Sequence, residues 1–434
     1  MYLAFDDTDS KDGMCTTYLM ARFLSETRYS IVGFPRLVRL NPNIRYKTRG
    51  NGALMVRIGT GGRGNPSKIG TYHGKDIVSY EDAVDVSDPG EILEEILGLM
   101  DILARYDDPE TNPGVVISGR QFPPWLYSEA LIREVTMGEV EEFLREHGAT
   151  WVKRKNGRGI IGSAAAISWP MHSLTYECIS YRAPHNVLDN RTKVEAAEYA
   201  DSLPGTFNNI DRENGYAAIF PRERTPVMYG IRSTGYEGLL EETEIMDRKF
   251  GLQSEGKILY VTNQGTDDHI LFDPLVLREL GSYSLEGEVS GNPWVIDGGH
   301  YFANIMNRNL EARICAFEPT KSFRRIFSQL RSGDRVRVFG SYVDGAIHVE
   351  KMQVLEVSRQ FSRVLPYCNE CGAQMKSKGE SDFRCPMCGK KKRYAEYRET
   401  KRKLSAGFYD VPVMARRHLS KPFELENMKE EPAQ

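Results

Sequence analysis

Four carboxylates lie close together near the start of the chain and could hold a metal ion beside a nucleotide. Asp6, Asp7, Asp9 and Asp12 fall within seven residues, directly after the apolar run YLAF, which predicts a short buried strand. Such carboxylates repel one another unless a cation neutralises them, and Mg2+ prefers carboxylate oxygens together with phosphates. Gly13 and the start of the following helix could present backbone N–H groups to a phosphate. The alternative is an Asp-rich turn that caps the helix; the metal–nucleotide site is the favoured interpretation.

Two more polar segments adjoin apolar strands, where binding residues are often found. The segment 41–52 (NPNIRYKTRGNG) is basic and rich in glycine, and it precedes an apolar strand near 53–58. It could hold the oxygens of a triphosphate or be an ordinary surface loop, and its residues favour neither interpretation. The segment 262–269 (TNQGTDDH) follows another apolar strand. A binding role and a capped turn both fit this segment, and the turn is slightly favoured.

Four of the seven cysteines have the spacing of a structural zinc site. Cys368-x2-Cys371 is followed by thirteen residues and then by Cys385-x2-Cys388. Each pair can aim two thiolates at one ion, and two pairs give a closed tetrahedral Zn2+ site that is structural rather than catalytic. The alternatives are incidental thiols or a redox pair. An odd number of cysteines argues against a disulfide framework, and we expect Zn2+ to fold this short segment.

A basic segment with aromatic residues follows the cysteines. KKKR at 390–393 and KRK at 401–403 are interleaved with Tyr394 and Tyr397, which suits phosphates and stacked bases. The alternative is a solvated, charged helix. The net charge of −3 hides an asymmetry, because residues 359–434 hold 17 basic and 10 acidic residues, a net of +7, which leaves 40 basic and 50 acidic residues, a net of −10, in the first 358. A basic arm on an acidic body is typical of a nucleic-acid partner.

These residues must be positioned by several domains, since 434 residues predict two to four. Strand-like and helix-like stretches alternate over 1–173 and indicate an α/β domain. The order over 174–280 approximates βαββαβ, the ferredoxin-like arrangement. Five strands with a helix between the third and fourth occupy 281–358 and predict an OB-fold β-barrel, a fold that often binds single-stranded nucleic acid. The segment 359–434 completes a multidomain α+β chain with a zinc ribbon and a basic tail.

Apolar residues at helical spacing locate the main helices of this arrangement. We expect helices over 16–25, 91–103, 132–145 (with its N-terminal boundary near Thr136), 192–203, 239–246 and 321–330. Strands that pair over 206–210 and 217–219, together with strands at 174–181, 227–231 and 258–262, complete the ferredoxin-like segment.

Composition excludes several classes of protein. With 40% hydrophobic and 27% charged residues, the chain is neither disordered nor a coiled coil. No run approaches the roughly 18 apolar residues that a membrane helix needs. The N-terminal MYLAFDDTDS has acids where a signal peptide needs basic and then apolar residues. We therefore expect a cytoplasmic protein with no membrane partner; nothing in the sequence indicates its oligomeric state.

Longer motifs spread over the chain resemble one known family. DDTDSKDGMCTTY, LVRLNPNIRYKTRGNGA, TNPGVV, TFNNID, TNQGTDDH, CAFEPTKSFR, the four-cysteine ribbon and ARRHLSKP occur in this order. Together they resemble the archaeal tRNA 2-agmatinylcytidine synthetases over essentially the whole chain. The sequence departs from the family pattern at Arg45-Tyr46, where proline is expected first after NPNI.

The resemblance implies a reaction and a domain order. Such enzymes attach agmatine, which is decarboxylated arginine, to C2 of the wobble cytidine in the CAU anticodon of the minor isoleucine tRNA. The product is agmatidine. The C2 oxygen is phosphorylated first, the agmatine amine then displaces phosphate, and ATP is consumed to AMP and phosphate. Family members have a kinase-like N-terminal domain, a ferredoxin-like domain, an OB-fold and a zinc ribbon.

The resemblance also implies roles for individual residues. The implied catalytic and metal-binding residues are Asp6, Asp7, Asp9 and Thr16, of which Thr16 is the threonine that the kinase domain phosphorylates on itself, with Thr17 in reserve. The implied contacts to ATP are Asp6, Asp7, Gly13, Lys47, Arg49 and Asn51. The expected cofactors are ATP, Mg2+ and a structural Zn2+ held by Cys368, Cys371, Cys385 and Cys388.

The two substrates require further residues. The guanidinium of agmatine needs carboxylates, ideally in bidentate contact, and Glu177, Asp211 and Asp267 are the candidates. The wobble base must leave the anticodon stack to react, while the OB-fold and the ribbon hold the anticodon loop and stem. The candidate tRNA contacts are Phe317, Phe323, Arg324, Arg325, Lys391 and Lys392.

Two other functions remain alternatives. A non-catalytic protein that binds single-stranded nucleic acid through its OB-fold and zinc ribbon would explain the C-terminal half but not the acidic loop. An ATP-dependent kinase or ligase of a small metabolite would explain the acidic loop but leave the nucleic-acid architecture without a role.

Overall fold

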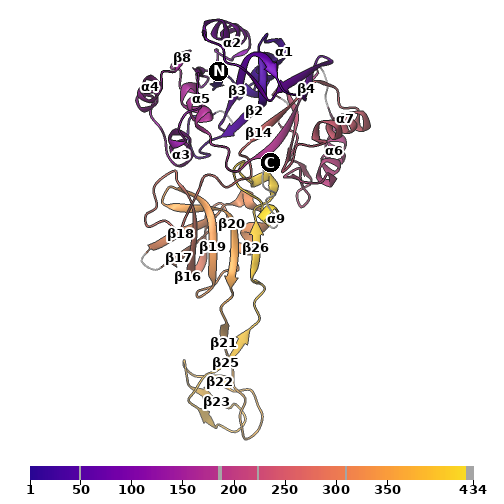
Figure 1. Ribbon diagram of the computed structural model, residues 1–434. Coiled ribbons are helices and arrows are strands. Elements are labelled where there is room, and N and C mark those ends of the chain that lie inside the picture. The colour runs from indigo at the N-terminus through magenta and orange to yellow at the C-terminus, as the bar shows by residue number, and fades with distance from the viewer. Residues whose placement is uncertain (48–49, 184–187, 222–223, 308–309, 427–434) are drawn as a thin grey trace.

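The computed structural model describes residues 1–47, 50–183, 188–221, 224–307 and 310–426 and has three parts along its length (Figure 1). The N-terminal two thirds of the chain form a body around one large sheet. A β-barrel lies beneath this body, and a small cysteine-containing unit lies at the far end of a two-stranded connection (Figure 1). The mixture of α and β elements predicted from the sequence is confirmed. Among the described residues, no helix is long and apolar enough to cross a membrane.

The body is built on a twelve-stranded sheet. Its strands run in the order β10 (Thr206–Phe207), β13 (Val227–Ser233), β9 (Thr175–Arg182), β14 (Ser254–Thr262), β4 (Ser67–Tyr72), β5 (Lys75–Tyr80), β2 (Ser30–Arg39), β3 (Gly52–Arg63), β1 (Tyr2–Asp6), β7 (Gly114–Ser118) and β8 (Thr150–Lys153), with β6 (Asp82–Val84) paired to β3. The central strands β1 and β7 are almost entirely apolar because both faces of the sheet are covered.

The two faces of this sheet have separate cores. Leu3 and Phe5 of β1 pack with α1 (Thr16–Glu26) and α2 (Gly90–Leu103), whereas Ala4 points to the other face. The helices on that second face are α3 (Trp125–Ile132), α4 (Met137–Glu146) and α5 (Gly159–Ser168). The sequence GIIGSAAAIS makes α5 almost wholly buried, and its small residues allow the helix to approach β1 closely.

Residues 175–262 contribute four neighbouring strands of the sheet in the order β10-β13-β9-β14, and all neighbours are antiparallel. The crossover connections are α6 (Asn190–Ser202) and α7 (Leu239–Phe250), and a short hairpin joins β11 (Ile210–Asp211) to β12 (Tyr216–Ala217). Strand β14 also pairs with β2 and β4. The two segments that the sequence suggests as separate domains, 1–173 and 174–280, therefore share one continuous sheet.

The barrel closes on itself through five strands. They are β16 (Ser282–Ile296), β17 (His300–Asn307), β18 (Leu310–Ala316), β20 (Ala346–Glu356) and β19 (Arg335–Val343), and β19 pairs back to β16. The 3-10 turn Glu318–Thr320 and α8 (Ser322–Phe327) lie between β18 and β19. The short β15 (Ile270–Phe272) and the late strand β26 (Gly407–Asp410) add to the edges at β16 and β20.

The chain leaves the barrel along β21 (Gln360–Val364) and returns along β25 (Glu396–Thr400), which pairs with β21. Between them lie β22 (Lys376–Ser377), β23 (Phe383–Arg384) and β24 (Lys391–Lys392) of the small unit. The basic segment after the last cysteine is therefore extended, and the alternative of a charged helix is wrong.

The predicted helices agree with the structure apart from their ends. The helix expected over 132–145 begins later, because α3 ends at Ile132 and a separate helix, α4, begins after Thr136. Thr136 caps α4, and Glu139 completes a capping box with it, as its predicted boundary required. The helix expected over 321–330 is limited to α8, Ser322–Phe327.

Candidate functional site

A cavity of about 1220 Å3 lies in the body beside β1, β2, β3, β9 and β13. Its wall combines Asp6, Asp7 and Asp9 from one part of the sheet with Glu177 and Arg232 from the other. This volume is large enough for a nucleotide together with a second small ligand. The sharing of one sheet by both segments thus creates a single site between them.

The acidic loop forms one end of this cavity. Strand β1 ends at Asp6, and Asp7 takes a left-handed backbone conformation with φ of 60°. The carboxylate of Asp6 accepts the Asp7 N–H at 2.7 Å, and Arg158 Nη2 lies 3.2 Å from Asp7 Oδ2. A side chain at Gly162 of α5 would collide with the Asp6 carboxylate. Gly162 is therefore required for the carboxylate to lie against the helix.

Asp6 and Asp7 lie in a buried environment in which a negative charge is unfavourable. Burial raises the pKa of Asp6 well above its usual range, and the neighbouring charge of Asp7 raises it further. Burial also raises the pKa of Asp7 to about 6, although Arg158 opposes the shift. Asp6, Asp7 and Asp9 do not bring three oxygens within 4.8 Å of one another, but carboxylates in a partly desolvated place fit Mg2+, which keeps several waters and would offset the cost of their charge.

Thr16 lines the same cavity at the first position of α1. Its hydroxyl accepts a hydrogen bond from Thr8 at 3.2 Å. Two hydrogen bonds fix the start of the helix to the sheet. The Thr17 carbonyl accepts them from the hydroxyls of Tyr181 and Tyr260 at 2.8 and 3.0 Å. The structure therefore places Thr16 at the cavity beside the acidic loop.

Some of the predicted phosphate-binding residues lie at the cavity and others do not. Lys47 and Asn51 line the cavity, and burial, together with the charge of Arg417, lowers the pKa of Lys47 to about 8. Arg49 lies outside the described residues. Gly13 is not among the residues that line the cavity, and its N–H donates to the Ser10 carbonyl at 3.4 Å within the turn. The structure thus does not support Gly13 as a phosphate donor.

Only one of the three predicted agmatine carboxylates lies at the cavity. Glu177 of β9 lines it, with Oε1 3.4 Å from Arg232 Nε. Asp211 instead accepts hydrogen bonds from Asn214 and from the Met414 N–H, and Asp267 pairs with Lys351 at 2.5 Å. Both carboxylates have structural partners away from the cavity, so their assignment to agmatine is not supported.

Sequence reasoning missed several residues that line the cavity. Arg39, Arg158 and Arg232 come from β2, the turn before α5, and β13. His418 comes from residues 411–421, which we call the C-terminal strap, and which runs from β26 back to the body. The motif ARRHLSKP contains this histidine, and a histidine within a basic motif was the available signal. The three arginines had no such signal in the sequence, because isolated arginines also occur as structural residues.

The candidate tRNA contacts of the barrel lie on and below its surface. Phe317 packs its ring edge against His300 and His348, with centroids 4.8 and 4.5 Å apart. Arg324 donates to the Gly299 carbonyl, and Arg325 is exposed and pairs with Glu213 at 3.0 Å. Phe323 is fully buried in the barrel core, so its assignment as a contact is wrong.

The basic residues of the small unit remain at its surface. Lys391 is exposed, and Lys392 pairs with Glu396 while its Nζ lies 4.5 Å from the Tyr394 ring centroid. The rings of Tyr394 and Tyr397 are themselves exposed. Basic and aromatic groups are thus available together on this surface.

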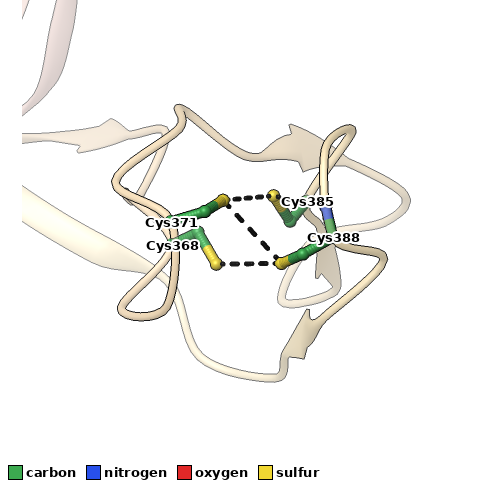
Figure 2. Close-up of side chains that lie close together, drawn as sticks. All are labelled: Cys368, Cys371, Cys385 and Cys388. Carbon is green, nitrogen blue, oxygen red and sulfur yellow. Dashed lines mark hydrogen bonds between the residues drawn. The ribbon is translucent and has the colours of Figure 1, made fainter.

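The four cysteines of the small unit converge on one point (Figure 2). Sulfur–sulfur distances include 3.5 Å for Cys368–Cys388, 3.3 Å for Cys371–Cys385 and 3.8 Å for Cys371–Cys388. A tetrahedral Zn2+ with Zn–S bonds of about 2.3 Å would place its sulfurs roughly 3.8 Å apart. Within the described ranges, this is the group in which three or more potential ligand atoms lie within 4.8 Å of one another. The arrangement fits Zn2+.

Three family models match the chain. They are described as the TiaS TCKD domain, the TiaS FLD domain and the TiaS C-terminal zinc ribbon domain, and they match residues 2–156, 157–269 and 365–404. A curated relative from Thermoplasma volcanium is 47% identical over 433 residues, which cover 99% of this chain and 98% of the relative. The chain belongs to the TiaS family.

Other relatives agree with this membership. A TiaS protein from Archaeoglobus fulgidus is 35% identical over 99% of this chain and 98% of its own length. Both relatives are named TiaS, the 2-agmatinylcytidine synthetase of the second isoleucine tRNA. A solved complex of TiaS with that tRNA and ATP is 33% identical, with a TM-score of 0.83 over 100% of this chain and 98% of that one. A complex of TiaS with the same tRNA, AMPCPP and agmatine is 30% identical, with a TM-score of 0.79 over the same shares.

Proposed function

We propose that this chain joins agmatine to C2 of the wobble cytidine of the CAU-anticodon isoleucine tRNA in an ATP-dependent reaction. The observation that carries the proposal is full-length membership of the TiaS family, whose solved relatives include complexes with the second isoleucine tRNA, ATP and agmatine. The large cavity with its acidic loop gives the chain a place for this chemistry. A tRNA substrate also favours action in the cytoplasm.

The reaction divides between two groups of cavity residues. A cytosine C2 oxygen is a poor leaving group, and transfer of one phosphoryl group from ATP makes it a good one, which the agmatine amine displaces as phosphate. Hydrolysis of the remaining phosphoanhydride leaves AMP and a second phosphate. Asp6, Asp7 and Asp9 would hold Mg2+, which supplies neutralisation of charge on the transferring phosphoryl group. Lys47 and Asn51, which line the same cavity, would contact the phosphates of ATP.

Thr16 is the proposed site of self-phosphorylation, with Thr17 in reserve. Its hydroxyl lies at the cavity beside the acidic loop, where a phosphoryl donor would be held. The start of a helix also favours a phosphate, because its free N–H groups and its dipole attract negative charge. The hydrogen bonds that fix the Thr17 carbonyl hold this helix start in place.

Glu177 is the proposed carboxylate for agmatine. It is almost fully buried yet lines the cavity, so a guanidinium bound to it would be shielded from water. Its pairing with Arg232 leaves Oε1 at 3.4 Å from Nε, which is longer than a strong ion-pair hydrogen bond. A substrate guanidinium could therefore compete for this carboxylate.

The domain labels inferred from the sequence are part of this proposal. The antiparallel order β10-β13-β9-β14 with two crossover helices supports the ferredoxin-like label, and the five-stranded closed barrel with α8 between its third and fourth strands supports the OB-fold. The kinase-like label for the N-terminal domain rests on the family resemblance. We assign the barrel and the ribbon to the anticodon loop and stem, with Phe317, Arg324, Arg325, Lys391 and Lys392 as proposed contacts.

One assay tests the proposal. Purified protein is combined with Mg-ATP, labelled agmatine and a transcript of the CAU-anticodon isoleucine tRNA, and each component is omitted in turn. Incorporation of label that requires every component supports the synthetase. RNA binding without ATP turnover would favour the non-catalytic alternative, and ATP turnover that ignores RNA would favour a small-metabolite enzyme.

A further inference from the structure

The C-terminal strap places His418 in the wall of the catalytic cavity. Backbone hydrogen bonds fix its position, since Gly265 N donates to the His418 carbonyl at 2.8 Å and Asp267 N donates to the Leu419 carbonyl at 2.9 Å. The ring lies against Gly50, where a Cβ would meet His418 Nε2 at 2.8 Å. Both His418 and Gly50 line the cavity. The position of His418 in the cavity wall is therefore fixed by the path of the strap.

Hydrogen bonds determine which ring nitrogen carries the proton. The Gln264 amide donates from Nε2 to the Glu177 carboxylate, which can only accept, and its Oε1 accepts from Arg232 Nε at 3.1 Å. The same Oε1 lies 2.8 Å from His418 Nδ1, so Nδ1 must be the donor. In a neutral ring this leaves Nε2 with a lone pair.

The surrounding charges keep the ring neutral. Burial lowers the pKa of His418 well below its usual range, and Arg39, Arg232 and Lys47 lower it further. The acidic group on this side of the cavity, Glu177, reaches the ring through Gln264. His418 therefore presents an unprotonated nitrogen before substrates bind.

We propose that His418 Nε2 accepts the proton that the primary amine of agmatine must lose to attack cytidine C2. The inference rests on the proposed function and adds a catalytic residue to it. The ammonium gives one proton to Nε2, and the freed lone pair forms the C2–N bond. The C2–O bond breaks, its electron pair leaves with the phosphate, and the departing phosphate takes the second proton from the attacking nitrogen. The imidazolium then returns its proton to solvent.

The spacing of the two groups suits a ligand with two basic ends. Glu177 and His418 are separated by a single side-chain amide, that of Gln264. Agmatine has a guanidinium at one end of a four-carbon chain and an amine at the other. With its guanidinium on Glu177, agmatine could place its amine at the neighbouring histidine. A carboxylate in the place of His418 would instead hold the amine as an ammonium, which cannot attack.

The cations around His418 also order the two steps. Arg39, Arg232 and Lys47 attract phosphate groups, and bound phosphate offsets their charge. Once a phosphorylated cytidine is in place, the ring becomes a better base than it is in the empty cavity. Proton acceptance is thereby linked to the presence of the leaving group.

Two substitutions of His418 test the inference. His418→Asn retains an N–H near the Nδ1 position for Gln264 but removes Nε2, and His418→Gln retains an acceptor near Nε2 that cannot take a proton. Single-turnover agmatine transfer and tRNA-dependent ATP cleavage are measured separately over a range of pH. We expect both variants to lose about 100-fold more in agmatine transfer than in ATP cleavage. Circular dichroism and tRNA binding establish that each variant is folded.

The pH profile and a second nucleophile distinguish proton transfer from a structural role. Transfer by the variants should rise about tenfold per pH unit toward the amine pKa of roughly 10, while the wild type levels off earlier. An O-alkylhydroxylamine, which is unprotonated at neutral pH, should restore transfer by both variants. Parallel profiles, equal loss of both steps, or wild-type transfer by His418→Gln would overturn the inference. Absence of agmatine transfer in the wild type would instead overturn the proposed function.

Discussion

Lys351 of the barrel binds both a loop of the body and the C-terminal segment after β26. Its replacement by methionine should weaken the contacts between these three parts. Its side chain is fully buried, with Nζ 2.5 Å from Asp267 Oδ2, 2.8 Å from the Lys421 carbonyl and 3.1 Å from Glu426 Oε1. Methionine retains most of the apolar stem, so the loss is mainly electrostatic. Removing one partner of a buried ion pair costs about 3–5 kcal/mol. Because Asp267 is 12% exposed and still accepts the Lys421 N–H, we expect the lower end, about 3 kcal/mol.

A matched control comes from a second buried lysine that lies within the body. Lys257 pairs with Asp247 at 2.8 Å, and the two side chains are 5% and 13% exposed, close to the values of 0% and 12% for the first pair. Lys257→Met should lower the denaturation midpoint by a similar amount. Only Lys351→Met should speed hydrogen exchange at the amides of Gly265 and Asp267, which bind the strap.

The double variant with Asp267→Asn completes the test. Once the lysine is absent, neutralising the aspartate removes the unpaired charge, so the two substitutions together should cost about 2 kcal/mol less than the sum of their separate effects. A coupling below about 0.5 kcal/mol would refute the reasoning. So would equal exchange at Gly265 in Lys351→Met and Lys257→Met.

Three further predictions concern the cavity and the ribbon. Asp7→Asn should reduce agmatine incorporation to less than about one hundredth, because a cation ligand is lost, while tRNA affinity measured by filter binding stays nearly intact; equal loss of both would contradict its role, and Asp107→Asn, at an exposed residue outside the cavity, is the control. Cys368→Ser, or zinc removal by a chelator, should abolish zinc content in metal analysis and weaken tRNA binding; unchanged zinc content would disprove the site. Glu177→Gln should raise the KM for agmatine about tenfold or more without a matching change in the KM for ATP, since a charged hydrogen bond is lost; a change in the KM for ATP alone would exclude this assignment.

Patterns that depend on local sequence predicted the elements well. The apolar spacing of α1 and α2, the capping residue Thr136 and the paired CxxC motifs each act within a few neighbouring residues. Such signals are readable from one sequence because helix periodicity, caps and knuckles require particular residues at fixed spacing. The strand order of the large sheet, with β14 beside β2 and β4, has no comparable local signal.

Contacts between distant segments explain what was missed at the site. Asp267 looked like a ligand for a cationic substrate, but a lysine 84 residues later in the chain binds it. Phe323 looked like a stacking residue and is a core residue of the barrel. The motif ARRHLSKP contains His418 but does not show that this segment reaches the cavity, because that placement depends on tertiary hydrogen bonds.

The path of the C-terminal strap has a consequence for synthesis of the chain on the ribosome. Domains fold as units during translation, with the N-terminal parts first. The strap follows the barrel and the ribbon in the sequence, so the body, the barrel and the ribbon leave the ribosome before this part of the cavity wall. Emergence of the strap is then the event that completes the catalytic cavity, and chains terminated before His418 lack it.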